Sequence, residues 1–252
     1  KSVDGNFDGF ELFYQGQVYS ETYELYGAEA LLRYHSPRFG NVSPLEFVPI
    51  LEQSNLMYPV GLWVIRQALK DCRSWREKLP DFHVSINMSY AQLEQNSIED
   101  DVLDIVKSSG VPGSALTIEV TESMEFSNYP QLNNYFRRWK NNGIEISVDD
   151  FGTGYSSLAR LKDMEIDEIK IDRYFVKEIQ KSAYNYRLLS NIIELAGSSR
   201  IRVCCEGVET LEELNALMDL HPNLIQGFLF AKPCSAPEFE QRFILGNQCQ
   251  ER

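Results

Sequence analysis

Cysteine pairs, long apolar runs and positive charge are scarce in this sequence of 252 residues. Its five cysteines are an odd number without a C-x-x-C spacing, which excludes a disulfide framework and a thiolate zinc site and favours a reducing compartment. The longest apolar runs are far shorter than a membrane span, and the polar first residues lack the apolar core of a signal peptide. We therefore expect a cytoplasmic chain, which can equally be the cytoplasmic domain of a membrane-anchored parent.

Positive charge is outnumbered, since 24 lysines and arginines face 37 aspartates and glutamates, for a formal net charge of −13. Such a chain repels nucleic-acid polymers and anionic membranes, and a phosphate-bearing ligand would need local neutralisation of the negative charge. The hydrophobic share of 43% is enough for a substantial core and excludes a disordered or collagen-like chain. The length suits one large α/β barrel or two small domains.

Short β-branched runs alternate along the chain with longer amphipathic stretches, a pattern typical of parallel strands joined by crossover helices. The first two runs leave no room for a helix between them and are predicted to pair as an antiparallel hairpin. The predicted strands are Glu11–Tyr19, Glu24–Tyr34, His83–Ser89, Leu116–Thr121, Glu145–Asp150, Glu168–Asp172, Arg202–Glu206 and Leu224–Phe230.

Domain organisation follows from the lack of any break in composition or charge pattern, which predicts a single domain. About eight strands with a helix after most of them indicate an α/β fold: a modified TIM (β/α)8 barrel with an irregular, partly antiparallel N-terminal strand pair. We expect the barrel over residues 10–246, after a linker remnant at 1–9 and before a tail at 247–252. The chain begins without Met, so an upstream sensor or cyclase domain in a longer parent protein is expected.

Three predicted helices begin with the sequence of a capping box, a Ser or Thr followed three residues later by Glu. The N-caps are Ser43, Thr210 and Ser235, and two of these boxes have a proline in the first turn. Each of the three side chains is expected to accept a hydrogen bond from the backbone of its own helix.

The predicted strands carry polar side chains on one face, whereas strands covered on both sides usually read as continuous apolar runs. In a barrel these groups would meet in the lumen, near the carboxyl ends of the strands, where active sites lie. A half-solvated antiparallel sheet would explain the alternation equally, but the helices between the strands weigh against it. The pairs that share a face are Glu29 with Arg33, Ser85 with Asn87, Thr117 with Glu119, Ser147 with Asp149, Lys170 with Asp172, and Arg202 with Glu206.

Five carboxylates are expected at this end of the barrel: Glu29, Glu119, Asp149, Asp150 and Glu206. They would repel one another unless cations or protons neutralised them. Oxygen ligands without paired His or Cys suit Mg²⁺ or Mn²⁺, and the two adjacent aspartates could bridge two such ions. Each acid taken alone is more often a solvated or salt-bridged residue, so the prediction depends on their joint placement.

Three further polar residues have ordinary structural interpretations. Asn87 alone could cap a turn, Lys170 could pair with Asp172, and Gln226 could hold a loop. The triplet Asp150-Phe151-Gly152 also occurs in protein kinases. A kinase or P-loop function is excluded, because the sequence contains no H-R-D loop, G-x-G-x-x-G loop or Walker A motif.

An ordered series of motifs resembles the EAL-domain family of cyclic di-GMP phosphodiesterases. The resemblance runs from about Phe10 to Phe243, and its specificity comes from the order of the motifs. They are Glu29-Ala30-Leu31, Asn87, Glu119-Val120-Thr121-Glu122, Asp149-Asp150-Phe151-Gly152-Thr153-Gly154, Lys170-Ile171-Asp172, Glu206-Gly207-Val208-Glu209 and Gln226-Gly227.

The resemblance implies a modified TIM barrel that binds two divalent cations, Mg²⁺ or Mn²⁺. It also implies hydrolysis of one phosphodiester bond of cyclic di-GMP to linear pGpG, by two-metal activation of water, in bacterial second-messenger signalling. Carried over from the family, Glu29, Asn87, Glu119 and Asp149 are ligands of the first metal. Asp149 also bridges to a second metal held by Asp150.

Other positions are assigned by the same resemblance. Lys170 matches a lysine that contacts the attacking water or the phosphate, and Glu206 matches an acid proposed as the general base. Gln15, Arg33 and Gln226 match substrate-contacting positions, and Arg33 is expected at the phosphate that is not cut. Glu122 matches an acid that stabilises the loop from Asp149 to Gly154, and in the family that loop is implicated in metal binding and dimer formation.

The sequence departs from the family pattern at two places, where Gly16 replaces the usual proline of Tyr-Gln-Pro and Cys205 replaces an alanine. Gly16 loosens the backbone after Gln15. Two alternatives to the expected enzyme stay open: a catalytically silent cyclic di-GMP receptor, and a hydrolase for another dinucleotide. A homodimer is expected from the family, without direct membrane contact.

Overall fold

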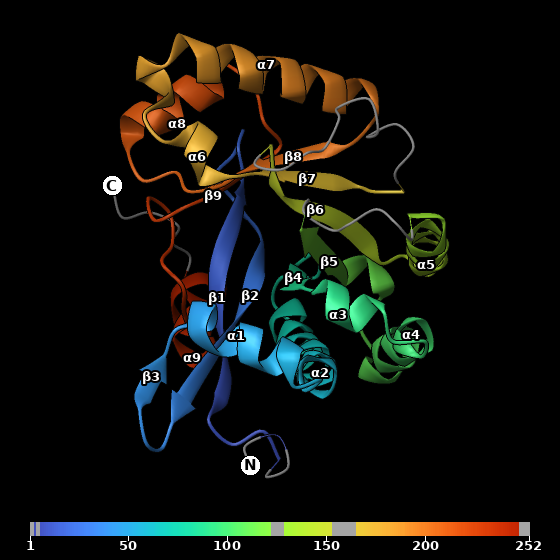
Figure 1. The fold of residues 1–252 in the computed structure, drawn as a ribbon. Helices are drawn as coiled ribbons and strands as arrows, with labels where there is room; N and C mark the ends of the chain where they lie inside the picture. The colour runs from blue at the N-terminus through green and yellow to red at the C-terminus, as the bar shows by residue number, and fades with distance from the viewer. Residues whose placement is uncertain (1–2, 4–5, 122–128, 153–164, 247–252) are drawn as a thin grey trace.

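Eight strands close into a barrel in the computed structural model, which describes residues 3, 6–121, 129–152 and 165–246 (Figure 1). Neighbouring strands from β2 to β9 pair in parallel, while β1 pairs antiparallel with both β2 and β9 and so closes the ring. The predicted barrel with an antiparallel N-terminal pair is confirmed. Its strands are β1 (Phe10–Tyr19), β2 (Leu25–Ser36), β4 (His83–Asn87), β5 (Leu116–Thr121), β6 (Glu145–Phe151), β7 (Glu168–Ile171), β8 (Arg202–Cys205) and β9 (Leu224–Gln226).

Two short strands extend the sheet outside the ring. β3 (Gly40–Val42) continues antiparallel from β2, and β10 (Cys234–Ser235) pairs with the middle of β1. At two or three residues, neither is long enough to leave an alternating pattern in the sequence, and neither was predicted.

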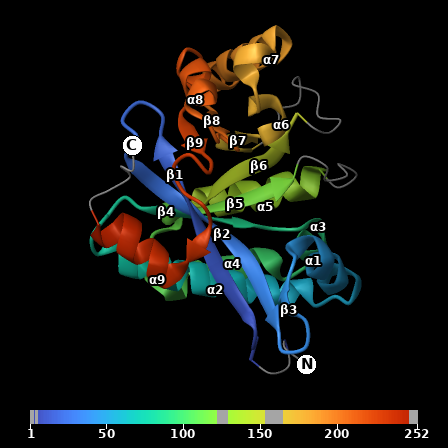
Figure 2. The ribbon, with the colours of Figure 1, turned by 90° about the vertical axis from the view of Figure 1, so that its left-hand side faces the viewer.

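Helices cover the outside of the barrel, with α2 against β4, α5 against β6 and α7 against β8 (Figures 1 and 2). Among the described residues no helix is both long enough and apolar enough to cross a bilayer. The α-helices are α1 (Pro44–Gln53), α2 (Met57–Arg76), α3 (Tyr90–Leu93), α4 (Ile98–Ser109), α5 (Tyr129–Asn141), α6 (Arg173–Val176), α7 (Ala183–Ser198), α8 (Leu211–Met218) and α9 (Ala236–Phe239), the last followed by a π-helical turn over Glu240–Leu245.

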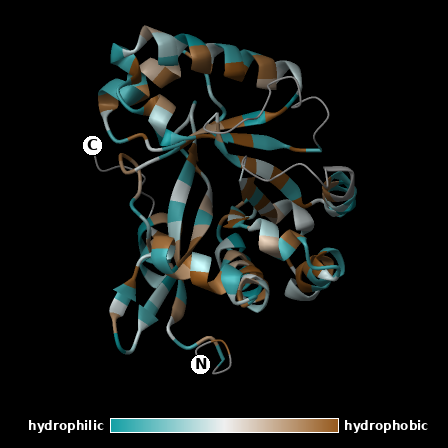
Figure 3. Ribbon diagram, in the orientation of Figure 1, coloured by the Kyte–Doolittle hydropathy of each residue, from teal (hydrophilic) through white to brown (hydrophobic). Residues whose placement is uncertain are grey.

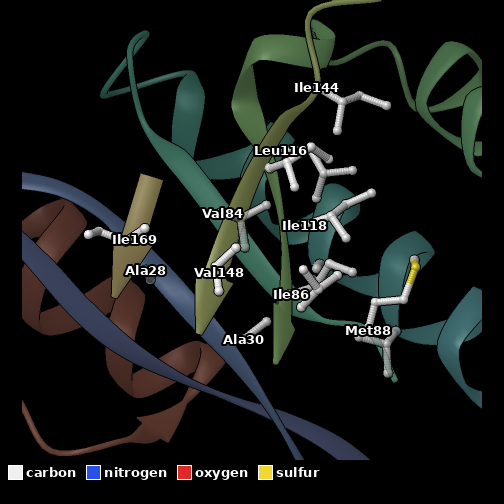
Figure 4. Packing of buried hydrophobic residues seen from close by; sticks show 14 of the residues in the cluster. Ala28, Ala30, Val84, Ile86, Met88, Leu116, Ile118, Ile144, Val148 and Ile169 are labelled. Atoms are coloured by element: carbon white, nitrogen blue, oxygen red, sulfur yellow. The ribbon is translucent and has the colours of Figure 1, made fainter. Parts of the chain in front are cut away.

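The apolar side chains of the strands pack in the layer between barrel and helices. Figure 4 shows side chains of β4, β5 and β6, such as Ile86, Ile118 and Val148, gathered in one buried cluster. Hydrophobic and hydrophilic residues alternate along the same ribbons in Figure 3. This alternation lets each strand contribute apolar groups to the core and polar groups to the lumen.

Only one of the three predicted capping boxes forms. The Thr210 hydroxyl accepts a hydrogen bond from the backbone N–H of Glu213, whose carboxylate accepts one from the Thr210 N–H. Ser43 and Ser235 stand at helix starts as predicted, but neither side chain caps its helix. At Ser43 the backbone carbonyl already accepts the N–H of Glu46 that the hydroxyl would have bound.

Candidate active site

The ammonium group of Lys170 lies at the centre of the predicted carboxylate cluster. Its Nζ is 3.0 Å from Glu29, 2.8 Å from Glu119, 2.6 Å from Glu206 and 3.7 Å from Asp149. Lys170 is completely buried, and its four partners come from β2, from β5, from β6 and from the residue after β8. The structure therefore brings together five residues that are far apart in the sequence. The simpler pairing of Lys170 with Asp172 was wrong, because the Asp172 carboxylate caps α6 by accepting the N–H of Tyr174.

Amide side chains hold Glu29 from two sides. Asn87 Nδ2 donates to Glu29 Oε1 at 2.7 Å, and Gln226 Nε2 donates to Glu29 Oε2 at 2.6 Å. Gln226 Nε2 is also 3.2 Å from Gln15 Oε1, and Gln15 in turn donates to the carbonyl of Ala231. Four predicted site residues from β1, β2, β4 and β9 thus form one connected network.

Burial makes most of these carboxylates difficult to ionise. It raises the pKa of Glu119 well above its usual range, with further contributions from Glu29 and Asp149, and it raises the pKa of Glu206 to about 8. Burial also raises the pKa of Asp149. The pKa of Glu29 is lowered, because Lys170 and the hydrogen bonds from the two amides outweigh the effect of burial.

The same carboxylates keep Lys170 charged. Burial acts to lower the pKa of the amine, but the nearby carboxylates of Asp149, Glu119, Glu206 and Glu29 outweigh burial and raise the pKa well above its usual value. An ammonium group with such surroundings contributes a permanent positive charge to the site.

Asp150 lies beside this centre, next to the last residue of β6. Its backbone adopts a φ of +55°, in the left-handed region, and its N–H donates to Asp149 Oδ1 at 2.9 Å. Burial, Asp149 and Asp172 raise the pKa of Asp150 to about 6. The predicted loop-stabilising residue Glu122 lies outside the described residues, as does Gly154 of the predicted loop.

A pocket of about 210 Å³ opens above the cluster. Glu119 and Lys170 are buried below it, and Asn87, Asp150 and Arg33 are not part of its lining. The guanidinium of Arg33 donates to the carbonyl of Leu32 and lies over the ring of Phe13. The lining residues are Gln15, Glu29, Asp149, Asp172, Arg173, Glu206, Gly207, Glu209, Gln226, Gly227 and Phe228.

Four of the lining side chains had no predicted role: Asp172, Arg173, Glu209 and Phe228. Each follows the carboxyl end of a barrel strand, the position at which active-site residues of such barrels are found. For Arg173 and Phe228 that position was the available signal, whereas Asp172 and Glu209 also stood in the quoted motifs. Position alone does not separate a residue that faces the pocket from one that faces solvent.

The oxygen atoms of the cluster fit a divalent cation. Glu119 Oε1 is buried without a hydrogen-bond partner, so one carboxylate oxygen retains an unfilled acceptor position. Among the described residues, no group of three or more Asp, Glu, His or Cys side chains is already arranged around a point suited to a metal. The carboxylates close on the Lys170 amine instead, and oxygen donors of this kind suit Mg²⁺ or Mn²⁺.

Comparisons with known proteins identify the family and the fold of the chain. A family model described as the EAL domain matches residues 5–233. The oxygen sensor protein DosP of Escherichia coli (strain K12) is 37% identical over 231 residues, which are 90% of this chain and 29% of that protein. The chain spans about a third of the length of such curated relatives.

Solved structures share the fold over almost the whole chain. The PaMucR phosphodiesterase in complex with c-di-GMP has a TM-score of 0.88 and 31% identity, with 94% of this chain and 96% of that chain covered. The Klebsiella pneumoniae protein BlrP1 in a manganese and cy-diGMP complex has a TM-score of 0.81 and 27% identity, with 91% and 57% covered. With the family model matched from residue 5 to residue 233 and relatives above 30% identity, the chain belongs to the EAL domain family.

Proposed function

We propose that this chain is a metal-dependent phosphodiesterase that hydrolyses one phosphodiester bond of cyclic di-GMP to linear pGpG. The observation that carries the proposal is the Lys170-centred cluster of an EAL-family barrel, in which four acids of the expected site, Glu29, Glu119, Asp149 and Glu206, surround the lysine. A catalytically silent receptor would tolerate the loss of these acids, whereas this chain retains them.

Metal dependence is a property of EAL phosphodiesterases, and the number and kind of ions belong to the proposal. Glu29, Asn87, Glu119 and Asp149 would hold a first Mg²⁺ or Mn²⁺ ion, and Asp149 with Asp150 a second. When bound, such ions neutralise charge on a phosphoryl group and lower the pKa of water.

The chain's own residues supply proton transfer, charge and orientation. Glu206 borders the pocket, and its pKa of about 8 suits an acid that takes and returns a proton near neutral pH. Lys170 supplies a fixed positive charge and keeps the carboxylates close together. Gln15, Gln226 and Arg33 are proposed to orient the ligand.

The decisive test is incubation of the protein with cyclic di-GMP and Mg²⁺ or Mn²⁺, with pGpG resolved by chromatography. We expect turnover that stops when a chelator is added and that falls by at least about a hundredfold in Asp149→Asn. An Asp149→Asn protein with the parent rate would refute the scheme. Binding without turnover in the parent would favour the receptor instead, and turnover of other dinucleotides at higher kcat/KM would change the substrate.

Stability of the metal-free protein is expected to fall as the pH rises from about 5 to about 8. The Glu206 pKa is raised from the usual 4.5 to about 8, so within this window the folded state binds a proton that the unfolded state has lost. That proton stabilises the fold at the lower pH, and the stabilisation disappears as the pH passes about 8.

Calorimetric unfolding at pH 5, 6, 7 and 8, with chelator and with Mn²⁺, measures this dependence. Mn²⁺ should raise the melting temperature more at pH 8 than at pH 5, and Glu206→Gln should flatten the metal-free profile. A metal-free melting temperature that rises over the same range would contradict the assignment.

Partners and location belong to the proposal as well. We propose a homodimer, an upstream sensor or cyclase domain in the parent protein, and a cytoplasmic site of action. The last is supported by four described cysteines, Cys72, Cys204, Cys205 and Cys234, which are all buried and free.

A further inference from the structure

The wall of the substrate pocket carries an excess of negative charge. Its described lining includes five carboxylates and a single cationic side chain, that of Arg173. Lys170 lies beneath the pocket, completely buried and surrounded by carboxylates, so its charge is already used within the cluster. A phosphate that enters this pocket therefore meets only one positive group on the described wall, the guanidinium of Arg173.

The backbone of Arg173 is held firmly while its side chain is not. Asp172 caps the short helix that Arg173 begins, and Gly207 packs so closely that a Cβ added there would lie 2.3 Å from the Cβ of Arg173. Beyond Cβ, the side chain is 54% exposed, and its guanidinium contacts the 40% exposed Glu209 at 3.3 Å. Such exposed ion pairs contribute little to stability, so a stronger acceptor can displace Glu209.

Glu209 itself is positioned independently of this ion pair. Its backbone N–H donates to the carboxylate of Glu213 at 3.0 Å, which also receives the N–H of Thr210 in the capping box of α8. The loop after β8 would thus keep its shape if Arg173 moved away.

We propose that Arg173 exchanges Glu209 for the phosphate of the substrate that lies beside Asp149 and Glu206, the phosphate to be cut. The inference rests on the proposed function and adds a residue to it. In the closed ring of strands, β7, which precedes Arg173, is four steps from β2, which carries Arg33, in either direction. The two arginines therefore stand on opposite sides of the barrel, as the two phosphates stand on opposite sides of a cyclic dinucleotide.

Binding of cyclic di-GMP tests the exchange, measured by titration calorimetry with Ca²⁺ replacing Mg²⁺ under conditions in which chromatography detects no pGpG. Arg173→Gln should weaken binding about tenfold, equivalent to about 1.4 kcal/mol, and Arg173→Lys should recover most of the loss. With Mg²⁺, kcat should also fall in Arg173→Gln, because negative charge on that phosphate grows in the transition state.

Glu209→Gln distinguishes exchange from a purely structural ion pair. Because it releases Arg173, Glu209→Gln should tighten binding of cyclic di-GMP two- to fivefold in the parent background. In the Arg173→Gln background the same substitution should leave the dissociation constant unchanged. A structural pair would instead make both substitutions harmful in the same direction. If Glu209 only repelled the ligand by its charge, Glu209→Gln would tighten binding in the Arg173→Gln background as well. Either this result or harm from both single substitutions would overturn the proposal.

A matched control is the ion pair of Arg242 with Glu238, also exposed, with 3.2 Å between the charged atoms and outside the pocket lining. Arg242→Gln and Glu238→Gln should leave the dissociation constant within twofold of the parent. An unchanged dissociation constant in Arg173→Gln would refute the role of Arg173 alone. Failure of the parent to bind or hydrolyse cyclic di-GMP would refute the proposed function itself.

Discussion

Replacement of Lys170 by methionine should lower hydrolysis of cyclic di-GMP by about a hundred- to a thousandfold, because it removes the fixed charge at the centre of the site. The same change leaves four clustered carboxylates without their shared cation. Removal of one partner from a buried ion pair costs about 3–5 kcal/mol, and we expect a loss of that order in the free energy of unfolding at pH 8 with chelator present.

Urea unfolding measures the loss in stability, and chromatography of pGpG measures the rate. The loss should be smaller at pH 5, where Glu119 and Glu206, whose pKa values are raised, retain protons. Lys181→Met is the matched control, because Lys181 pairs with Glu178 on the surface and its loss should change the free energy of unfolding far less. Equal losses at the two lysines would show that the Lys170 cluster contributes no more than an exposed ion pair.

Replacement of Glu119 by glutamine should change activity and metal-free stability in opposite directions. Hydrolysis should fall by about a hundredfold or more, because a proposed metal ligand loses its negative charge. The buried Oε1, which has no hydrogen-bond partner, would no longer be a carboxylate oxygen available to a metal. In chelator at pH 8 the protein should become more stable, because burial raises the pKa of the native Glu119 carboxyl and so opposes its ionisation. Such a trade-off between activity and stability is expected for a residue that function requires but that destabilises the folded state.

Titration with Mn²⁺, followed by calorimetry, separates the two effects. Metal affinity should fall together with activity, while the metal-free melting temperature should rise. Glu178→Gln serves as the control, because within the described part of the chain its exposed carboxylate forms an ion pair with Lys181 alone. Neither the metal affinity nor the melting temperature should change appreciably. A Glu119→Gln protein that binds Mn²⁺ like the parent would exclude Glu119 as a ligand.

The fold could be predicted from the sequence because the sequence shows both the two-residue period of strands and the amphipathic period of helices. Alternation in β4 to β8 indicated strands with one polar face, and the amphipathic stretches between them indicated covering helices. Predicted strand ends differed where tertiary contacts intervene. β9 ends at Gln226 instead of Phe230, because the chain turns there: the N–H groups of Phe230 and Ala231 both donate to the carbonyl of Gly227.

The site was predictable as a set of residues but not as a set of contacts. Spacing placed Glu29, Glu119, Asp149 and Glu206 at strand ends, and the closed ring does bring them together. The residue that joins them was less evident, since a lysine two positions from an aspartate suggests a local pair. In the barrel, Asp172 lies beyond the end of β7 and caps α6, so Lys170 contacts the acids of other strands.

The sequence by itself therefore determined the order of the strands along the chain, the polar lumen and the family, because these follow from local periodicity and from an ordered series of short motifs. Only the tertiary structure decided which charged groups meet. One buried ammonium contacts four carboxyl groups, Glu119 Oε1 has no hydrogen-bond partner, and Arg173 is the single cation on the described pocket wall. The physical reason is that ionisation and pairing depend on burial and on distances of a few ångströms between strands far apart in the chain, which no local pattern encodes.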